Sequence, residues 1–175
     1  IAIIIVAVIL GVYLGLKFPI IGLLCLVGGL GFAIFVLMSN KQGALVDSAA
    51  RADAQTGVPA EGKARIYVMR KGFMAGMQGM DITVNDTHKG QIRSGYFMMA
   101  EVDPGTHHLT ARFSKQTEST RQSHDVTLAA GQIILFDMTF DMGMVQGTIR
   151  FDEAHDAGHI RQKIANLKMI GWLQG

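Results

Sequence analysis

The chain has 175 residues, a formal net charge of +2 and 49% hydrophobic residues. This length allows one ordinary domain plus a further segment. The small charge and the lack of a basic stretch interleaved with aromatic residues exclude a typical nucleic-acid-binding surface. The single cysteine, Cys25, lies in an apolar stretch and therefore says nothing about the redox compartment.

Residues 1–40 are almost entirely apolar, with Lys17 as their only charged side chain before residue 41. A membrane-spanning helix needs about 20 apolar residues, and one helix through the whole segment would be about 60 Å long, twice the thickness of the hydrocarbon core. Pro19 lacks a backbone donor and Lys17 can reach a headgroup, so we expect the chain to reverse there. The segment predicts a two-helix transmembrane hairpin. The alternative is one span plus an apolar segment buried in a partner.

Small residues within this segment predict close packing of its two helices. Gly11 and Gly15 are four residues apart, as are Gly29 and Ala33, and such pairs let helix backbones approach each other. Lys41 and Arg51 follow the second helix whereas the turn has one lysine, which slightly favours a cytoplasmic domain.

Residues 41–62 form a polar connector rich in alanine and glycine, which is compatible with a short helix over residues 44–54. From residue 63 to residue 152, short alternating segments separated by turn residues predict an antiparallel β-sandwich. Leu109, Ala111 and Phe113 share one face of their strand, as expected for a half-buried sheet. The expected strands cover residues 64–70, 81–85, 89–92, 96–102, 107–113, 123–128, 132–140 and 145–151.

The last segment, residues 153–175, predicts an amphipathic helix, because Ile160, Ile164 and Leu167 form one apolar stripe. This stripe can pack on the sandwich, lie at a membrane interface or dock on another subunit. We favour packing on the chain's own domain.

A series of short blocks runs through the sandwich region. They are ARIYVMR at residues 64–70, ITVND at 82–86, GQI at 90–92, GYF at 95–97, VDPGTH at 102–107 and LAAGQ at 128–132. Over roughly residues 63–165 the chain resembles an uncharacterised bacterial family of small β-rich domains that are often carried on lipoproteins. The resemblance implies a β-rich fold and a bacterial envelope or membrane setting, and it supplies no catalytic residue. Together with the hairpin, it leads us to expect a two-pass protein of the bacterial inner membrane.

Two positions depart from the family pattern. Asp86 stands where a glycine is usual, and Lys89 stands where an apolar residue is usual. The turn chemistry survives, because Asn85 and Asp86 both tolerate left-handed backbone geometry. We expect His107 of the VDPGTH block to fix a turn through a ring hydrogen bond.

Two apparent catalytic motifs fail on their context. Residues 57–64, GVPAEGKA, approach a phosphate-binding loop, but Ala64 replaces the Ser or Thr that holds Mg²⁺ and a strand is expected to follow. His155 and His159 are four apart on the predicted last helix, but they lack the glutamate of a zinc-protease motif and we expect them on the surface. Ser114, Ser119 and Ser123 have no identifiable base, and we expect them to act only in loop structure.

Methionines and histidines offer the one definite metal hypothesis. Thioether sulfur favours Cu(I), and imidazole can complete such a site. Met also fills irregular apolar contacts, and no tight Cys/His cluster is present, so metal binding is the weaker interpretation. The candidate ligands are Met74, Met77, Met80 and His88.

The sequence predicts a non-enzymatic, membrane-anchored accessory subunit without a cofactor. It is expected to contact the lipid bilayer and other integral membrane proteins of a larger bacterial complex, an energy-converting one for example. The alternative is an envelope module that binds a ligand or a Cu(I)-type metal.

Overall fold

The computed structural model describes residues 15, 17–38, 43–72, 79–114, 121–142 and 147–173. The chain divides into two compact units, Ile1–Asn40 and Lys41–Gly175. In the first unit the described helix is α2, Pro19–Met38. A Cβ atom added at Gly22 would lie 2.8 Å from the Cα atom of Gly15, so the chain turns sharply between these two glycines.

The structure corrects the prediction of a two-helix transmembrane hairpin over residues 1–40. Within the described residues no helix is both long enough and apolar enough to cross a membrane. Most of the first predicted helix, residues 1–16, lies outside the described residues. The prediction of a two-pass inner-membrane protein is corrected with it.

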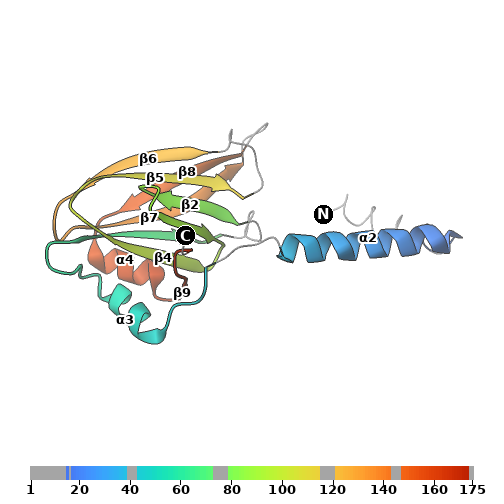
Figure 1. Cartoon of the computed structure of the whole chain (residues 1–175), viewed down its shortest axis with the longest axis horizontal. Coiled ribbons are helices and arrows are strands. Elements are labelled where there is room, and N and C mark those ends of the chain that lie inside the picture. The colour runs from blue at the N-terminus through green and yellow to red at the C-terminus, as the bar shows by residue number, and fades with distance from the viewer. Residues whose placement is uncertain are drawn as a thin grey trace. The chain divides into compact units, whose positions relative to one another are not determined.

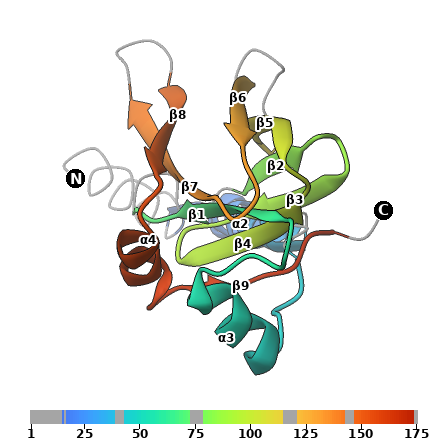
Figure 2. The ribbon, with the colours of Figure 1, turned by 90° about the vertical axis from the view of Figure 1, so that its left-hand side faces the viewer.

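The second unit is a sandwich of two β-sheets, as predicted. Over the described residues, a five-stranded sheet has the order β8-β7-β1-β4-β9 and a four-stranded sheet has the order β3-β2-β5-β6. Figures 1 and 2 show the two sheets stacked face to face. The eight expected strands are all present, with ends that differ by a few residues. Their bounds are β1 Ala64–Arg70, β2 Met80–Val84, β3 His88–Ile92, β4 Tyr96–Val102, β5 Gly105–Phe113, β6 Gln122–Leu128, β7 Ile133–Met142, β8 Gly147–Ala154 and β9 Lys168–Met169.

The sandwich is not purely antiparallel, which is a second correction to the predicted fold. β1 pairs with β7 in parallel, with Ile66 opposite Ile134, and β9 runs parallel to β4. Every side chain of β1 is buried, because this strand is central in its sheet and both of its faces are covered. A strand of this kind is apolar almost throughout and does not alternate. Its sequence therefore does not show whether it pairs with its neighbours in parallel or antiparallel.

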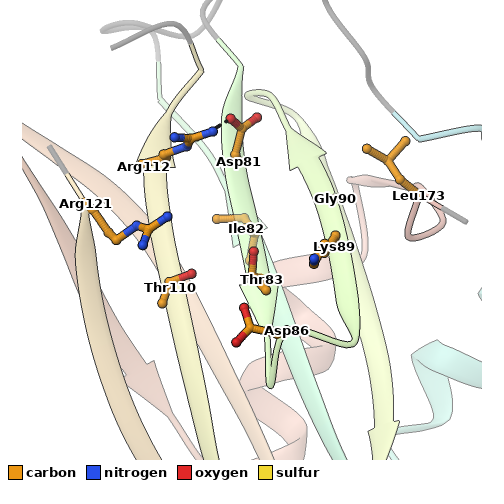
Figure 3. Close-up of a pocket in the computed structure, with 10 residues that line it drawn as sticks. All are labelled: Asp81, Ile82, Thr83, Asp86, Lys89, Gly90, Thr110, Arg112, Arg121 and Leu173. Atoms are coloured by element: carbon orange, nitrogen blue, oxygen red, sulfur yellow. Dashed lines mark ion pairs between the residues drawn. The ribbon is translucent and has the colours of Figure 1, made fainter. Parts of the chain in front are cut away.

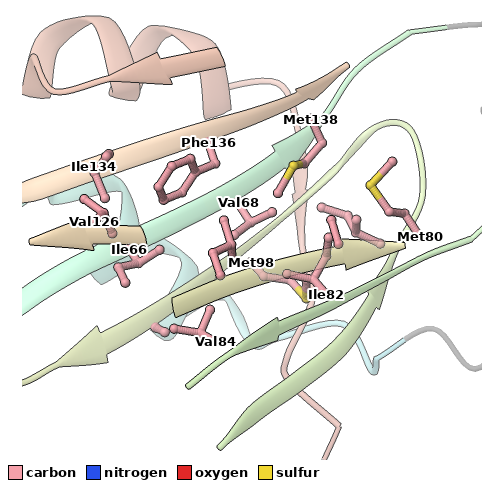
Figure 4. Close-up of a cluster of buried hydrophobic side chains, with 14 of the residues drawn as sticks. Ile66, Val68, Met80, Ile82, Val84, Met98, Val126, Ile134, Phe136 and Met138 are labelled. Carbon is pink, nitrogen blue, oxygen red and sulfur yellow. The ribbon is translucent and has the colours of Figure 1, made fainter. Parts of the chain in front are cut away.

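The main core lies between the two sheets (Figure 4). β5 contributes Leu109, Ala111 and Phe113 to this core, and β7 contributes Ile134 and its neighbours on the same face. These are the faces that the alternation predicted. The same alternation leaves the opposite side chains of β5 outside the core.

A helical layer covers the outer face of the five-stranded sheet. It contains α3, Ser48–Thr56, and α4, Ala157–Ile164, and Figure 2 shows both on the same side. The apolar stripe Ile160, Ile164 and Leu167 is buried against this sheet, so the predicted packing of the stripe on its own domain is confirmed. Tyr67 ties α3 down by donating its hydroxyl proton to the carbonyl oxygen of Ala54 at 2.7 Å.

The predicted C-terminal helix over residues 153–175 is much shorter in the structure. Residues 153 and 154 still belong to β8, and Asp156 caps α4 by accepting a hydrogen bond from the backbone amide of His159 at 2.7 Å. After α4 the chain becomes extended and enters the sheet edge as β9, because its backbone groups find partners there. The amide of Lys168 donates to the carbonyl of Gly95 at 3.1 Å, and the amide of Ile170 donates to that of Phe97 at 3.0 Å.

The segment 168–173, which we call the C-terminal tail, touches both sheets. Besides pairing with β4, it forms an isolated bridge between Leu173 and Lys89 of β3. The indole of Trp172 donates a hydrogen bond of 2.7 Å to the carbonyl of Met99. A further bridge joins Leu45 to Ile170, so residues 44–46 cover the outer edge of β9.

Candidate functional site

A hollow of about 280 Å³ lies on the outer face of the four-stranded sheet (Figure 3). Strand alternation puts its side chains there. On β2, Met80, Ile82 and Val84 are buried and the intervening residues point outward. We call this feature the sheet hollow. It is lined by Asp81, Ile82, Thr83, Asp86, Lys89, Gly90, Thr110, Arg112, Arg121 and Leu173.

A fixed carboxylate closes one end of the sheet hollow. The Oδ1 atom of Asp81 accepts hydrogen bonds from Gln91 Nε2 at 3.0 Å and from Ser114 Oγ at 2.5 Å. Arg112 lies opposite Asp81 in the register of β2 and β5, and its Nε atom is 3.5 Å from Asp81 Oδ2. Gln91 and Ser114 are buried. Asp81 therefore has one defined orientation rather than a mobile surface position.

The backbone at Gly79 helps to hold this network. A Cβ atom at position 79 would lie 2.5 Å from the Cδ atom of Gln91, so only glycine leaves room for the amide. The carbonyl of Gly79 also accepts a hydrogen bond of 3.0 Å from the amide of Ser114. Gly79 thus brings the start of β2 and the end of β5 close together.

Charges of both signs surround the rest of the sheet hollow. Arg112, Arg121 and Lys89 supply positive charge, and Asp81 and Asp86 supply negative charge. The hydroxyls of Thr83 and Thr110 lie between them (Figure 3). The lining contains no histidine or cysteine among the described residues, so it offers ion pairs and hydrogen bonds to a ligand rather than a nucleophile with a base.

The β2–β3 turn borders this face and confirms two predictions. Asn85 and Asp86 have φ values of 51° and 55°, the left-handed geometry expected for this pair. The Nδ2 atom of Asn85 donates to Nδ1 of His107 at 2.7 Å, which leaves Nε2 to donate to the carbonyl of Asp103 at 2.8 Å. His107 therefore fixes two turns.

The structure separates the two predicted metal ligands that it describes, Met80 and His88. Met74 and Met77 lie outside the described residues. Met80 is fully buried and pairs with Ile92, whereas His88 pairs with Val84 at the other end of the same two strands. Within the described part of the chain, no group of three or more His, Cys, Asp or Glu side chains could hold a metal ion.

His88 faces the C-terminal tail instead. Its ring meets Trp172 edge-on at a centroid distance of 5.5 Å, and its buried Nδ1 atom has no hydrogen-bond partner among the described residues. Burial lowers the pKa of His88 below its usual value. A neutral ring in the sandwich is the consequence.

The other candidate residues are separated by the fold. His155 follows β8 and His159 lies in α4, so the expected helical pair does not share a helix. His155 lies 3.4 Å from Glu153, which also binds His124 of β6 at 2.7 Å. Ser114 is part of the Asp81 network, Ser123 is exposed on β6, and Ser119 lies outside the described residues.

Sequence reasoning missed the residues of the sheet hollow. Asp81 and Arg112 are far apart in the sequence and meet only through the register of β2 and β5, and Arg121 joins them from just before β6. The sequence did contain one indication, because alternation along the two predicted strands places both Asp81 and Arg112 on the outward face.

The fold and the hollow define a mainly-β sandwich domain with helices on one outer face and a polar surface of mixed charge on the other. The chain belongs to the family described as Protein of unknown function (DUF2846), which matches residues 60–149. The match runs from just before β1 to the beginning of β8. The predicted resemblance to an uncharacterised family is thereby confirmed. A comparison with curated proteins finds no match.

Proposed function

We propose that the protein is a non-enzymatic accessory subunit that contacts another protein through the outer face of its four-stranded sheet. One observation carries this proposal: the helices cover the outer face of the five-stranded sheet, whereas the outer face of the four-stranded sheet carries the sheet hollow. Bare antiparallel faces are common. A concave bare face with Asp81 fixed by three neighbours is a more specific feature.

The chemistry of this face suits a polar protein surface. Protein interfaces combine charges and hydrogen-bonding groups whose arrangement selects the partner. Lys89, Arg112 and Arg121 together with Asp81 and Asp86 present such a pattern. A nucleic-acid strand is a poorer fit, because the lining lacks an aromatic stacking platform.

The expected partners, integral membrane proteins of a larger complex and the lipid bilayer, stay predictions. The alternative of a Met- and His-rich metal module also stays a prediction, and the separation of Met80 from His88 gives it no support.

Site-directed photo-crosslinking tests the proposed face. A photoreactive residue at Thr110 in the full chain is expected to capture one defined protein, and the same residue at the exposed Thr56 of α3 is the control for the helical side. Adding Lys89→Glu and Arg121→Glu to this chain is expected to abolish the crosslink from position 110, because each substitution reverses a charge of the sheet hollow.

Lys168→Glu is the matched charge reversal, since Lys168 is exposed and lies on β9 outside the sheet hollow. In a chain that carries Lys168→Glu, the crosslink from position 110 is expected to stay unchanged. Purification of the chain as a lone monomer, or a Thr110 crosslink that survives both reversals, contradicts the proposal.

A further inference from the structure

A second and larger hollow, of about 510 Å³, lies where the C-terminal part of α4 meets the five-stranded sheet. We propose that this hollow binds a small organic anion made of a carboxylate and a short apolar group. Its volume falls in the range of about 300–1,000 Å³ that is usual for small-molecule sites. We call it the helix hollow. It is lined by Met69, Lys71, Ser94, Gly95, Asp137, Gln162, Lys163, Asn166 and Leu167.

The helix hollow is apolar on one side. Met69 of β1 and Leu167, which follows α4, line it, and both belong to the core between the sheet and the helices. Because these side chains are held by that core, they form a preformed wall rather than a mobile surface. Burying a few methylene groups against such a wall favours binding, because apolar surface leaves water.

Among the described residues, the charged groups that line the helix hollow leave one lysine without an opposite charge. Lys163 is already neutralised, since its Nζ atom lies 2.9 Å from Asp137 Oδ2 and the side chain of Asp137 is only 16% exposed. Lys71 makes no hydrogen bond or ion pair with any described residue. A single anionic group is therefore the charge that this hollow accommodates.

Hydrogen-bond donors and amides surround the same space. Ser94 Oγ accepts from the amide of Gly72 at 3.1 Å, which leaves its hydroxyl proton to donate. Gln162 and Asn166, on and just after α4, have no partner among the described residues. A carboxylate accepts several hydrogen bonds and matches this set of donors better than a cation or an alcohol does.

This site is independent of the sheet hollow. The two hollows share no lining residue, and they lie on different sheets of the sandwich. Failure of either proposal leaves the other standing.

Methyl NMR of the full chain labelled at its methionine methyl groups tests the proposal with hexanoate as the probe. Met69 reports from the helix hollow, and Met138, buried in the core between the two sheets, is the internal reference. Hexanoate is expected to shift the Met69 signal saturably and to leave the Met138 signal in place. Hexanamide, which has the same size and no charge, is expected to bind about tenfold or more weakly.

Two variants complete the test. Lys71→Gln is expected to weaken hexanoate binding about tenfold or more, whereas Lys89→Gln, in the sheet hollow, leaves it unchanged. Lys71 is exposed, so its substitution is expected to leave the thermal midpoint close to that of the parent chain. No saturable shift of Met69, equal binding of hexanamide, or equal binding by the Lys71→Gln chain overturns the proposal.

Discussion

The two outer faces of the sandwich differ although their strands follow the same alternation. On the five-stranded sheet, Tyr67 and Met69 point away from the other sheet and are buried by α3 and α4. On the four-stranded sheet, Thr83 and Thr110 occupy the equivalent outward positions and line an open hollow. Helical cover thus turns one face into a second core, whereas no described helix covers the other face.

The largest expected effect comes from opening the covered face. Ile164→Ala removes a fully buried side chain between α4 and the sheet, and we expect it to lower the free energy of unfolding by about 2–5 kcal/mol. Urea denaturation followed by the fluorescence of the single tryptophan measures it. Thr110→Ala, on the bare face, is the matched control and is expected to cost within about 0.5 kcal/mol. Equal losses in the two variants contradict the distinction between the faces.

A smaller effect is expected where the C-terminal tail joins the two sheets. A Cβ atom at Gly90 would lie 2.8 Å from Met98 Sδ and 3.2 Å from Trp172 Cε3. We therefore expect Gly90→Ala to destabilise the domain by about 1–3 kcal/mol through overpacking.

The double variant with Met98→Ala separates overpacking from other causes. Removing the nearer of the two neighbours relieves the clash, so the cost of Gly90→Ala is expected to fall in that background. A cost that stays the same in both backgrounds points away from contact with Met98.

The sequence specified the strands better than their arrangement. β1 and β4 were predicted with their observed ends, since turn residues and apolar runs are local signals. The parallel pairing of β1 with β7 and the meeting of Asp81 with Arg112 depend on register between distant segments, which no local pattern encodes.

The last segment shows how tertiary contacts override a local period. The stripe of Ile160, Ile164 and Leu167 was correctly assigned to the core, but the helix stops at Ile164. Beyond it, Lys168 gains a backbone partner just before β4, Ile170 gains one in β4, and Trp172 gains the carbonyl of Met99. Sheet pairing therefore decides a conformation that periodicity alone assigns to a helix.

The turn that borders the sheet hollow gives the third prediction. Asn85 has φ 51°, and its side chain both donates to His107 and accepts from the amide of His108 at 2.8 Å. Asn85→Ala loses these bonds and keeps the unfavourable left-handed backbone, so we expect a loss of about 1–3 kcal/mol in unfolding free energy. Asn85→Gly removes the same side chain without the backbone cost, and chemical denaturation is expected to rank it between the parent and Asn85→Ala. The reverse order excludes backbone geometry as a cause.

The smallest expected effect is a pH dependence at the inner face of β3. Burial lowers the pKa of His88 from the ordinary value of 6.5, so between its two pKa values the unfolded chain binds the proton and the folded chain does not. The contribution of a neutral His88 is therefore complete above pH 6.5 and declines as the pH falls below that value, until the folded ring also takes up a proton. His88→Phe keeps an aromatic ring beside Trp172 and removes the titration.

Unfolding free energies of the parent and His88→Phe chains from about pH 8 to about pH 5 isolate this contribution. The parent is expected to lose stability relative to His88→Phe as the solution becomes acidic. His108, His124 and His155 each contact a carboxylate, and they are present in both chains, so their contributions cancel in the difference. If the stabilities of the two chains change in parallel with pH, His88 takes up its proton equally well in the folded and the unfolded chain, which requires water to reach the ring beside Trp172. The four-stranded sheet would then admit water at its β3 edge as well as on its outer face. The two sheets would differ in the access of water to their cores as well as in the cover of their outer faces.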